Sequence, residues 1–293
     1  MNPDVSIYCT VKNAEETLPA TLRSIAEQRA VSWELVLVDD GSTDRTLALL
    51  RSFARVFPDG MVRIIPSGGI GRGAALNRAW AACRANHLAN LDADDLFHPH
   101  KLALQLAVMR AHPGVELLVT NSLYIGATQS PHWPELPLPV GPAVSPGSPA
   151  SPGDLPVPRD ISALLGRFNP VNHSSVMIRR AALERVGGYN AQRRAQLDYD
   201  LWIRLAAAGS RLHQLDLPLS AKRLHAAQFF EARVSVSYIF SSFVLQNRAI
   251  RALGLPPRYY ALSALRVPYR LLPHRLRRLL ALPKRVLLSR PAR

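Results

Sequence analysis

Three carboxylates, Asp92, Asp94 and Asp95, lie within four residues of one another and directly follow the apolar run 85–91. Such a run is typical of a buried strand. An ionised carboxylate is very costly to bury without a partner, so the cluster belongs where the strand gives way to a surface loop. Mg²⁺ and Mn²⁺ prefer oxygen ligands, and Mg²⁺ commonly binds one or two carboxylates together with substrate phosphates. The stretch therefore indicates either a cation site or a turn that simply favours aspartate.

Strands and helices that alternate at short spacing must position this cluster. Apolar, β-branched runs predict strands over residues 5–10, 33–38, 61–65 and 87–91. Helical spacing of apolar residues predicts helices over residues 14–28, through Leu47, Leu50 and Phe53, and over residues 71–85, with Ser42 or Thr43 available as a cap. This alternation predicts an α/β protein with a mainly parallel sheet and helices on both faces.

Polar loops follow four of the predicted strands. They contain Asn13, Asp40, the stretch Gly68–Gly73, and the Asp92-x-Asp94 pair. Because the carboxyl ends of parallel strands meet at one edge of the sheet, where such proteins bind ligands, we expect these loops to converge. That convergence favours the cation site over the simple turn.

The second half of the chain has a less regular pattern. It predicts helices over residues 99–111, 181–186, 197–208 and 236–253, and strands over residues 115–124 and 171–179. Between them, proline recurs every two to four residues from Pro131 to Pro158. This spacing excludes a helix or a central strand and predicts an extended insertion, either a linker or a flap over a site.

Positive charge is concentrated toward the C-terminus. The net charge is +15, and no Asp or Glu follows Glu231. From Arg258 onward arginine alternates with leucine, and Pro268, Pro273 and Pro283 are expected to divide the segment into short pieces. A basic, Leu-rich amphipathic extension suits an anionic membrane surface, although a partner-docking helix or a disordered basic end would have the same composition. Nucleic acid is not expected as a partner, because no nucleic-acid-binding fold accompanies the basic segment.

The remaining composition restricts the class of protein. Cys9 and Cys83 are the two cysteines, and both lie in apolar runs, which indicates neither a disulfide framework nor a zinc site. The first residues lack the pattern of a signal peptide, and no uncharged apolar run reaches the roughly 18 residues needed to span a bilayer. We expect a cytoplasmic protein, and the basic extension would allow peripheral attachment to the inner face of the cell membrane.

Four motifs occur in a fixed order along the chain. They are Val5-Ser-Ile-Tyr-Cys-Thr-Val-Lys-Asn13, Val38-Asp-Asp-Gly-Ser-Thr-Asp44, Leu91-Asp-Ala-Asp-Asp95 and Leu197-Asp-Tyr-Asp-Leu-Trp-Ile-Arg204. Together they resemble the GT-A glycosyltransferases of family 2, which are inverting enzymes that use nucleotide-diphospho-sugars. The resemblance covers roughly residues 4–228. It implies a Rossmann-like GT-A catalytic domain over residues 1–230, followed by a basic helical extension over residues 231–293.

The resemblance implies roles for the acidic residues and the first loop. Asp94 matches the position that binds Mg²⁺ or Mn²⁺, Asp92 matches the position that holds the ribose or sugar of the donor, and Asp40 matches the acceptor for a nucleobase N–H such as that of uracil. Thr10 and Asn13 border the base. Lys12 replaces the aromatic residue that commonly stacks on the base, and a lysine can lie over a ring or approach a phosphate.

The glycine-rich stretch has two interpretations. Gly69-x-Gly71-x-x-Ala74 imitates a dinucleotide fingerprint, but it follows the third strand instead of the first and would leave the acidic motifs unexplained. The resemblance places this loop, with Gly71, Arg72 and Asn77, beside the sugar and phosphates of the donor.

Inverting transfer needs a base that takes the proton of the acceptor hydroxyl. The family places it in a Glu-Asp pair that opens a helix; here Leu197 stands at the Glu position and Asp198 matches the base. Capping of the helix would explain an aspartate equally well, and Asp200 is the near alternative. His173 stands where relatives often have a His or a small polar residue that borders the acceptor, although a single histidine more often has a structural role.

Arg223-x-His225 resembles an Arg-x-His element of the family. There, His225 would complete the metal shell or contact the diphosphate, and Arg223 would neutralise the diphosphate.

The sequence thus predicts a glycosyltransferase that moves a sugar, UDP-linked by expectation, to a glycan or lipid-linked acceptor in cell-surface polysaccharide synthesis. The alternative is a non-catalytic scaffold that binds nucleotide-sugars, which the departures at Leu197 and Lys12 would suit.

Overall fold

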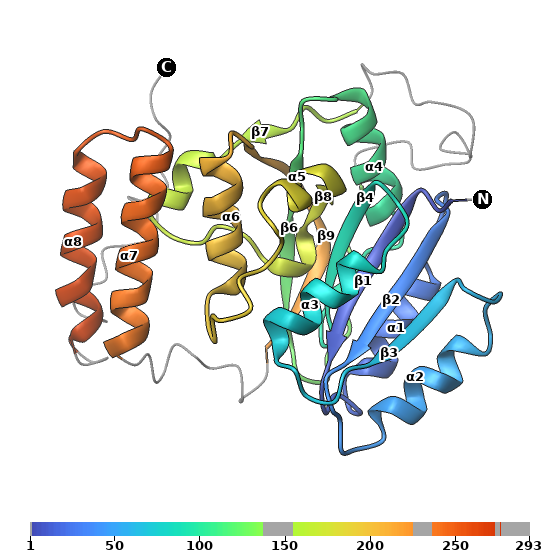
Figure 1. Ribbon diagram of the computed structural model, residues 1–293. Coiled ribbons are helices and arrows are strands. Elements are labelled where there is room, and N and C mark those ends of the chain that lie inside the picture. Colours follow the sequence, from blue (N-terminus) through green and yellow to red (C-terminus); the bar gives the residue numbers. More distant parts are fainter. Residues whose placement is uncertain (1, 137–154, 225–235, 273–275, 277–293) are drawn as a thin grey trace.

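The computed structural model describes residues 2–136, 155–224, 236–272 and 276. A mixed sheet of nine strands forms its centre, and helices cover both faces (Figure 1). The strand order is β3-β2-β1-β4-β8-β6-β9-β5, and β7 pairs with β9. The expected α/β architecture is confirmed.

The first half of the sheet is parallel and consists of short strand–helix units. Its strands are β1 (Val5–Val11), β2 (Trp33–Asp39), β3 (Val62–Pro66) and β4 (His87–Asp92). Its helices are α1 (Leu18–Ala26), α2 (Thr46–Ala54) and α3 (Arg72–Ala81). α1 begins at Leu18, so that Pro19 lies in the first turn, where the N–H that proline lacks would have no helical partner.

Alternating residues of β1 pack on opposite faces of the sheet. Val5, Ile7 and Cys9 belong to the apolar cluster that contains α1, α2 and α4 (Lys101–Ala111). Tyr8 belongs to the other cluster, with α3 and α6 (Leu197–Ala207). Side chains in a strand point alternately to its two faces, so one short strand holds both helical layers together.

The second half of the sheet depends on contacts between distant segments. β8 (Met177–Arg179) is antiparallel to β4 and β6 (Leu117–Gly126), and β6 is parallel to β9 (Leu212–Leu224). The short strands β5 (Leu96–Phe97) and β7 (Arg159–Asp160) pair antiparallel with β9. The 3₁₀ helices η3 (Ser162–Gly166) and η4 (His173–Ser175) and the helix α5 (Arg180–Arg185) complete this half.

One expectation for this half was wrong, and one strand was missed. The strand expected over residues 171–179 is reduced to Met177–Arg179, because His173–Ser175 form a 3₁₀ turn in which Ser174 and Ser175 donate hydrogen bonds. β9 was not expected at all. Its pattern is interrupted at Pro218, where its register against β6 shifts, and a proline is tolerated at such an irregularity.

Two helices follow near the C-terminus, α7 (Val236–Ala252) and α8 (Arg258–Leu271). α8 continues through Pro268, contrary to the expectation of shorter pieces. The carbonyl that loses its partner there belongs to the exposed Ala264, so water can replace the missing bond. Most of the Pro-rich insertion, residues 137–154, and the end of the extension lie outside the described residues.

Among the helices of the described ranges, none has the length and apolar character required to cross a membrane.

Candidate active site

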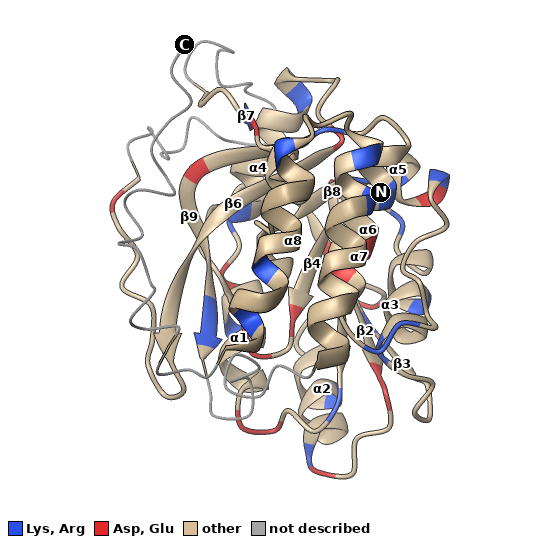
Figure 2. Ribbon diagram, turned by 90° about the vertical axis from the view of Figure 1, so that its left-hand side faces the viewer, with Lys and Arg blue, Asp and Glu red and all other residues tan. Residues whose placement is uncertain are grey.

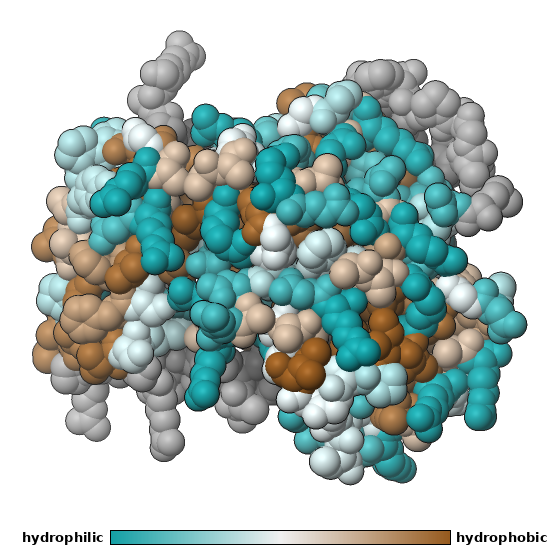
Figure 3. All heavy atoms as spheres, viewed as in Figure 1, coloured by the Kyte–Doolittle hydropathy of each residue, from teal (hydrophilic) through white to brown (hydrophobic). Residues whose placement is uncertain are grey.

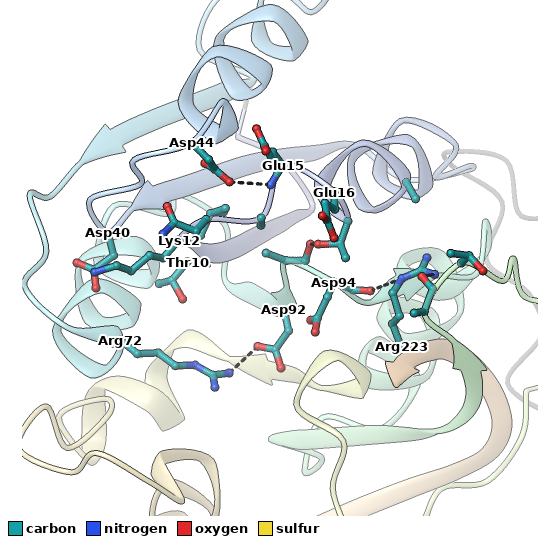
Figure 4. A pocket seen from close by; sticks show the side chains of 18 of the residues that line it. Thr10, Lys12, Glu15, Glu16, Asp40, Asp44, Arg72, Asp92, Asp94 and Arg223 are labelled. Atoms are coloured by element: carbon teal, nitrogen blue, oxygen red, sulfur yellow. Dashed lines mark hydrogen bonds and ion pairs between the residues drawn. The ribbon is translucent and has the colours of Figure 1, made fainter. Parts of the chain in front are cut away.

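A cleft of about 1050 Å³ opens at the carboxyl edge of the parallel strands (Figure 4). It is lined by the loops after β1, β2, β4 and β6 and by the N-terminus of α3. The sequence predicted all of these except the loop after β6. The lining includes Thr10, Lys12, Asn13, Asp40, Arg72, Asp92, Asp94 and Arg223. This volume lies at the upper end of the range for small-molecule sites and would accommodate a ligand of nucleotide-sugar size.

The charge of the cleft is unbalanced. Its acidic residues are Glu15, Glu16, Asp40, Asp44, Asp92 and Asp94, and its basic residues are Lys12, Arg72 and Arg223. A ligand that carries a diphosphate would therefore meet an excess of negative charge unless a cation lies between them. The chemistry of the lining thus fits a divalent cation.

Asp92 is held by two basic partners. Arg72 Nη2 donates to its Oδ1 at 2.8 Å, and His173 Nδ1 lies 3.2 Å from the same oxygen. Burial would raise the pKa of Asp92, but the charges of Arg72 and His173 outweigh it, so the pKa falls well below its ordinary value. The pKa of Arg72 is correspondingly raised, first by Asp92 and also by Asp198. Asp92 is therefore a carboxylate whose direction into the cleft is fixed.

A chain of hydrogen bonds supports this carboxylate from behind. His173 Nε2 lies 2.7 Å from the Tyr189 hydroxyl, which lies 2.7 Å from the Tyr8 hydroxyl. His173, Tyr189 and Tyr8 are all buried. The chain links the centre of β1 to the acidic loop and leaves the imidazole little freedom to turn.

The other two carboxylates of the loop differ in environment. Asp94 lines the cleft, and Figure 4 shows its side chain extending toward Asp92. Asp95 is buried behind the loop, where Ser174 Oγ and Arg223 N donate to its two oxygens at 2.6 and 3.1 Å. Burial, with the charges of Asp92 and Asp94, raises the pKa of Asp95. Asp95 anchors the loop, whereas Asp94 faces the ligand space.

Asp40 joins the second loop to the glycine-rich loop. Ser67 Oγ donates to its carboxylate at 2.8 Å, and Gly71 N donates to it at 3.1 Å. Gly71 has φ of 90° and Gly69 has φ of 87°. The backbone would be strained if either residue carried a side chain. Gly71 therefore acts through its backbone, and it does not itself line the cleft.

The first loop is fixed to the second through Asn13, which adopts φ of 50°. Its side-chain oxygen accepts from Thr43 N at 2.8 Å, and its own N–H donates to Ser42 Oγ at 3.0 Å. Ser42 and Thr43 therefore bind this loop instead of capping α2, whose Thr46 N–H is bound by Asp44. Lys12 and Thr10 lie in the cleft between Asp40 and Asp92 (Figure 4).

Asp198 lies in the first turn of α6. Asn169 Nδ2 donates to its Oδ2 at 2.7 Å, and its charge acts on Arg72 and Tyr189. Asp200 is buried and paired with Arg204 at 2.8 Å, so it is not available as a base. Asp198 does not line the cleft itself, but its electrostatic effect on Arg72 indicates that it lies near that residue.

Three of the expected site residues have other surroundings. Asn77 does not line the cleft, because its amide is engaged by the backbone N–H and carbonyl of Tyr189 and by the indole of Trp80. Arg223 lines it, but its guanidinium donates to the carbonyls of Asp94, Gly126, Ala127 and Gln129, so it holds loops and is not directed at a phosphate. His225 lies outside the described residues.

The cleft also contains residues that the sequence reasoning missed. Glu15 and Glu16 line it from the loop after β1, and Ala127–Ser130 line it from the loop after β6. The acidic pair could have been found, because it directly follows the first predicted strand. The segment after β6 could not, because its place depends on β9.

Solved structures share this fold. The S. aureus TarS fragment in complex with UDP-GlcNAc aligns with a TM-score of 0.65 at 14% identity, over 94% of this chain and 77% of that one. Mannosyltransferase PcManGT from Pyrobaculum calidifontis, in complex with GDP-Man and Mn²⁺, aligns with a TM-score of 0.61 at 20% identity, over 99% and 82%. The chain thus has the GT-A fold of these structures, with its Asp-x-Asp loop at the carboxyl edge of the sheet.

Sequence comparison is more specific. The model of the family "Glycosyl transferase family 2" matches residues 6–148. EpsE of Bacillus subtilis is 29% identical over 262 residues, which are 87% of this chain and 84% of EpsE. The amylovoran biosynthesis glycosyltransferase AmsE of Erwinia amylovora is 27% identical over 206 residues, 70% and 69% of the two chains. The chain is therefore similar to glycosyl transferase family 2 over residues 6–148, and to these two relatives over most of its length.

Proposed function

We propose that this glycosyltransferase moves a sugar from a UDP-linked donor to an acceptor hydroxyl with inversion at the anomeric carbon. The observation that carries the proposal is the convergence of Asp40, Asp92 and Asp94 in one cleft, beside Arg72. Three carboxylates spaced along one ligand space can address the base, the ribose or sugar, and the diphosphate of one donor.

Donor recognition would begin at Asp40. Its hydrogen bonds to Ser67 and Gly71 orient the carboxylate, and a carboxylate has about four lone-pair sites, so it retains capacity for a base N–H. Uracil offers such an N–H, and the TarS fragment, which has the same fold, was solved in complex with UDP-GlcNAc. Thr10, Lys12 and Asp92 line the same space, and Asp92 would bind the ribose or sugar.

A divalent cation, Mg²⁺ or Mn²⁺, would be held by Asp94. No group of three or more His, Cys, Asp or Glu side chains able to hold a metal occurs within the described ranges, so the donor phosphates are expected to supply further ligands. When bound, the cation stabilises the charge that develops on the departing diphosphate. The Mn²⁺ beside GDP-Man in PcManGT and the acidic excess of this cleft support this assignment. His225 stays a prediction as a further ligand.

Asp198 is proposed as the base. In the transfer step the acceptor oxygen bonds to the anomeric carbon as the bond from that carbon to the phosphate oxygen breaks. The nucleoside diphosphate leaves with the electron pair, and the hydroxyl proton passes to the Asp198 carboxylate. The hydrogen bond from Asn169 would orient the carboxylate without removing its second oxygen from use.

The acceptor is proposed to be a glycan or lipid-linked glycan in cell-surface polysaccharide synthesis. The name of AmsE, an amylovoran biosynthesis glycosyltransferase, supports this class of pathway. The position that the family fills with Glu is Leu197, which is buried, so no carboxylate orients the acceptor at that point.

The proposal is tested by thermal shift with UDP, GDP, CDP and dTDP, each with and without Mn²⁺. A ligand that binds the folded state raises its apparent stability, so UDP with Mn²⁺ should give the largest shift. Asp94→Asn should lose the Mn²⁺-dependent part, and Asp216→Asn, at an exposed position 69% accessible, should keep it. A larger shift with GDP would contradict the UDP assignment.

A non-catalytic scaffold is the second candidate, and the buried Leu197 favours it. Such a protein would bind UDP in the same assay. It would neither transfer the sugar nor slowly hydrolyse UDP-sugars during long incubation, whereas the proposed transferase would do at least the latter.

A further inference from the structure

The two C-terminal helices form an antiparallel hairpin on one side of the catalytic domain (Figure 1). α7 packs inward through Ile239, Leu245 and Ala249, whereas α8 packs on α7 and buries Ser263 alone. Ser263 Oγ donates to Gln246 on α7 at 2.9 Å. Among the described residues, α8 is thus an outer helix that packs mainly on α7.

The exposed face of α8 is apolar along three turns. Its exposed residues from position 260 to 271 are Tyr260, Ala261, Leu262, Ala264, Leu265, Pro268, Tyr269 and Leu271. Leu265 is the most accessible of its large apolar side chains, at 67%. Arg266 and Arg270 lie to the side, where they line a small hollow against α7. A soluble monomer rarely exposes a contiguous apolar surface of this kind without a binding role.

The first turns of α7 extend this surface. Val236, Phe240 and Val244 are exposed and recur every four residues, which places them along one side of the helix. Because the hairpin is antiparallel, the start of α7 lies beside the end of α8. Figure 3 shows apolar surface gathered over this end of the two helices.

The charge around this surface has one sign. The described residues of the hairpin, 236–272, contain five Arg and no Lys, Asp or Glu. Figure 2 looks onto the hairpin and marks basic positions along α8 and toward the C-terminal end of α7. A second copy of this chain would bring the same positive charge to the contact, so self-association is disfavoured. An anionic surface would complement it.

The hairpin is also fixed to the catalytic machinery. Arg193 Nη2 donates to Ser241 on α7 at 2.8 Å, and Gln196, the residue before α6, bonds to Ser241 and Ser242. In Figures 1 and 2 the start of α7 and the end of α8 lie at the same end of the molecule as the carboxyl edge of β1 and β2. A surface that bound the hairpin would therefore lie at the end at which the cleft opens.

We propose that the apolar face of α8, together with Val236, Phe240 and Val244 of α7, binds the headgroup region of an anionic lipid bilayer. The leucine side chains enter the interface, and the exposed Arg248, Arg251 and Arg258 bind lipid phosphates. Bound in this way, the protein would present its cleft to acceptors at the membrane surface. The binding itself does not depend on the proposed transfer reaction.

The test is co-sedimentation of the full chain with vesicles of phosphatidylcholine, with and without phosphatidylglycerol. Wild type should bind the anionic vesicles, and the double variant Leu262→Glu/Leu265→Glu should bind them roughly tenfold or more weakly, because it places charge where apolar side chains enter the interface. The control Val56→Glu changes an exposed valine, 75% accessible, on the far side of the catalytic domain and should bind like wild type. Thermal unfolding verifies that each variant is folded.

A second measurement reports on the face directly. A Leu265→Cys variant can be labelled with an environment-sensitive fluorophore, because Cys9 and Cys83 are buried. Its emission should shift to the blue with anionic vesicles and not with neutral ones. Binding that survives the double variant, or emission that does not change on binding, would overturn the proposal. So would a concentration-dependent dimer that the double variant dissociates while vesicle binding is unchanged.

Discussion

The two halves of the sheet contribute to the cleft in different ways. The parallel half, β1 to β4, brings its residues there by short loops that directly follow strands, and side chains such as Asp40 and Lys12 meet the ligand space themselves. The second half acts mainly from behind. Ser174, His173 and Arg223 are buried, and they hold Asp95, Asp92 and the loop after β6 in place.

The parallel half thus contributes the residues that contact a ligand, and the second half contributes the residues that hold them in position. Residues of the parallel half can change with the donor while the fold is kept, because their backbone is fixed by strand pairing. Residues of the second half cannot change singly without leaving a buried polar group unpaired, which typically costs about 1–3 kcal/mol. Asp198 is the exception, since it comes from the second half and is proposed to act on the acceptor.

The largest expected effect tests that exception. Asp198→Asn should lower kcat by roughly 10²- to 10⁴-fold, because the amide cannot take the acceptor proton. Binding of UDP, measured by titration calorimetry, should stay close to wild type. Asp216→Asn is the matched control at an exposed carboxylate. Activity of Asp198→Asn within a few-fold of wild type would show that the second half supplies no base at this position.

An intermediate effect on activity is expected at His173, where the second half of the sheet supports Asp92 of the parallel half. His173→Phe removes the partner of both Asp92 and Tyr189, so Asp92 should lose its fixed direction. By analogy with groups that orient metal ligands, we expect kcat/KM to fall roughly 10- to 100-fold, mainly through a higher KM for the donor. His132→Phe, at an exposed histidine, is the control. A fall in thermal stability with an unchanged KM would mean that His173 serves packing alone.

The smallest effect on activity is expected at Lys101, which neither lines the cleft nor supports a residue that does. Lys101 is fully buried, its Nζ donates to Gln105 at 2.7 Å, and burial lowers its pKa to about 7. Since the pKa is lower in the folded chain than in the unfolded one, the unfolded state binds more protons between about pH 7 and pH 10.5. Stability should therefore rise with pH over that interval.

Lys101→Met should remove this pH dependence and stabilise the protein at neutral pH by about 1–3 kcal/mol, because a buried charge is replaced by an apolar side chain of similar length. Urea unfolding at pH 7 and pH 9.5 measures both effects. A variant less stable than wild type at pH 7 would mean that the contacts to Gln105 and Phe97 outweigh the cost of burial.

The sequence allowed prediction of the parallel half because each of its parts is local. A strand, a polar loop and a helix follow within about 30 residues, so Asp40 and Asp92 could be placed at one edge from spacing alone. The fold class was predicted in the same way and is confirmed.

The second half could not be predicted because its positions depend on partners far along the chain. β9 is specified by its pairing with β6, about 90 residues earlier, and its own pattern is broken at Pro218. Arg223 carried a motif that suggested a phosphate ligand, but its four carbonyl partners are set by the tertiary fold. Asn77 was misassigned for the same reason, since Tyr189 lies 112 residues away.

The bonds of Arg223 have a consequence for altering this enzyme. The guanidinium grips the loop after β6 through the carbonyls of Gly126, Ala127 and Gln129, and these acceptors are the same whatever side chains the loop carries. Thr128 and Ser130 line the cleft from that clamped backbone. A library randomised at these two positions would therefore vary the side chains that line the cleft while the backbone of the loop stays in place. The loop is thus a suitable place to select for new sugar preferences.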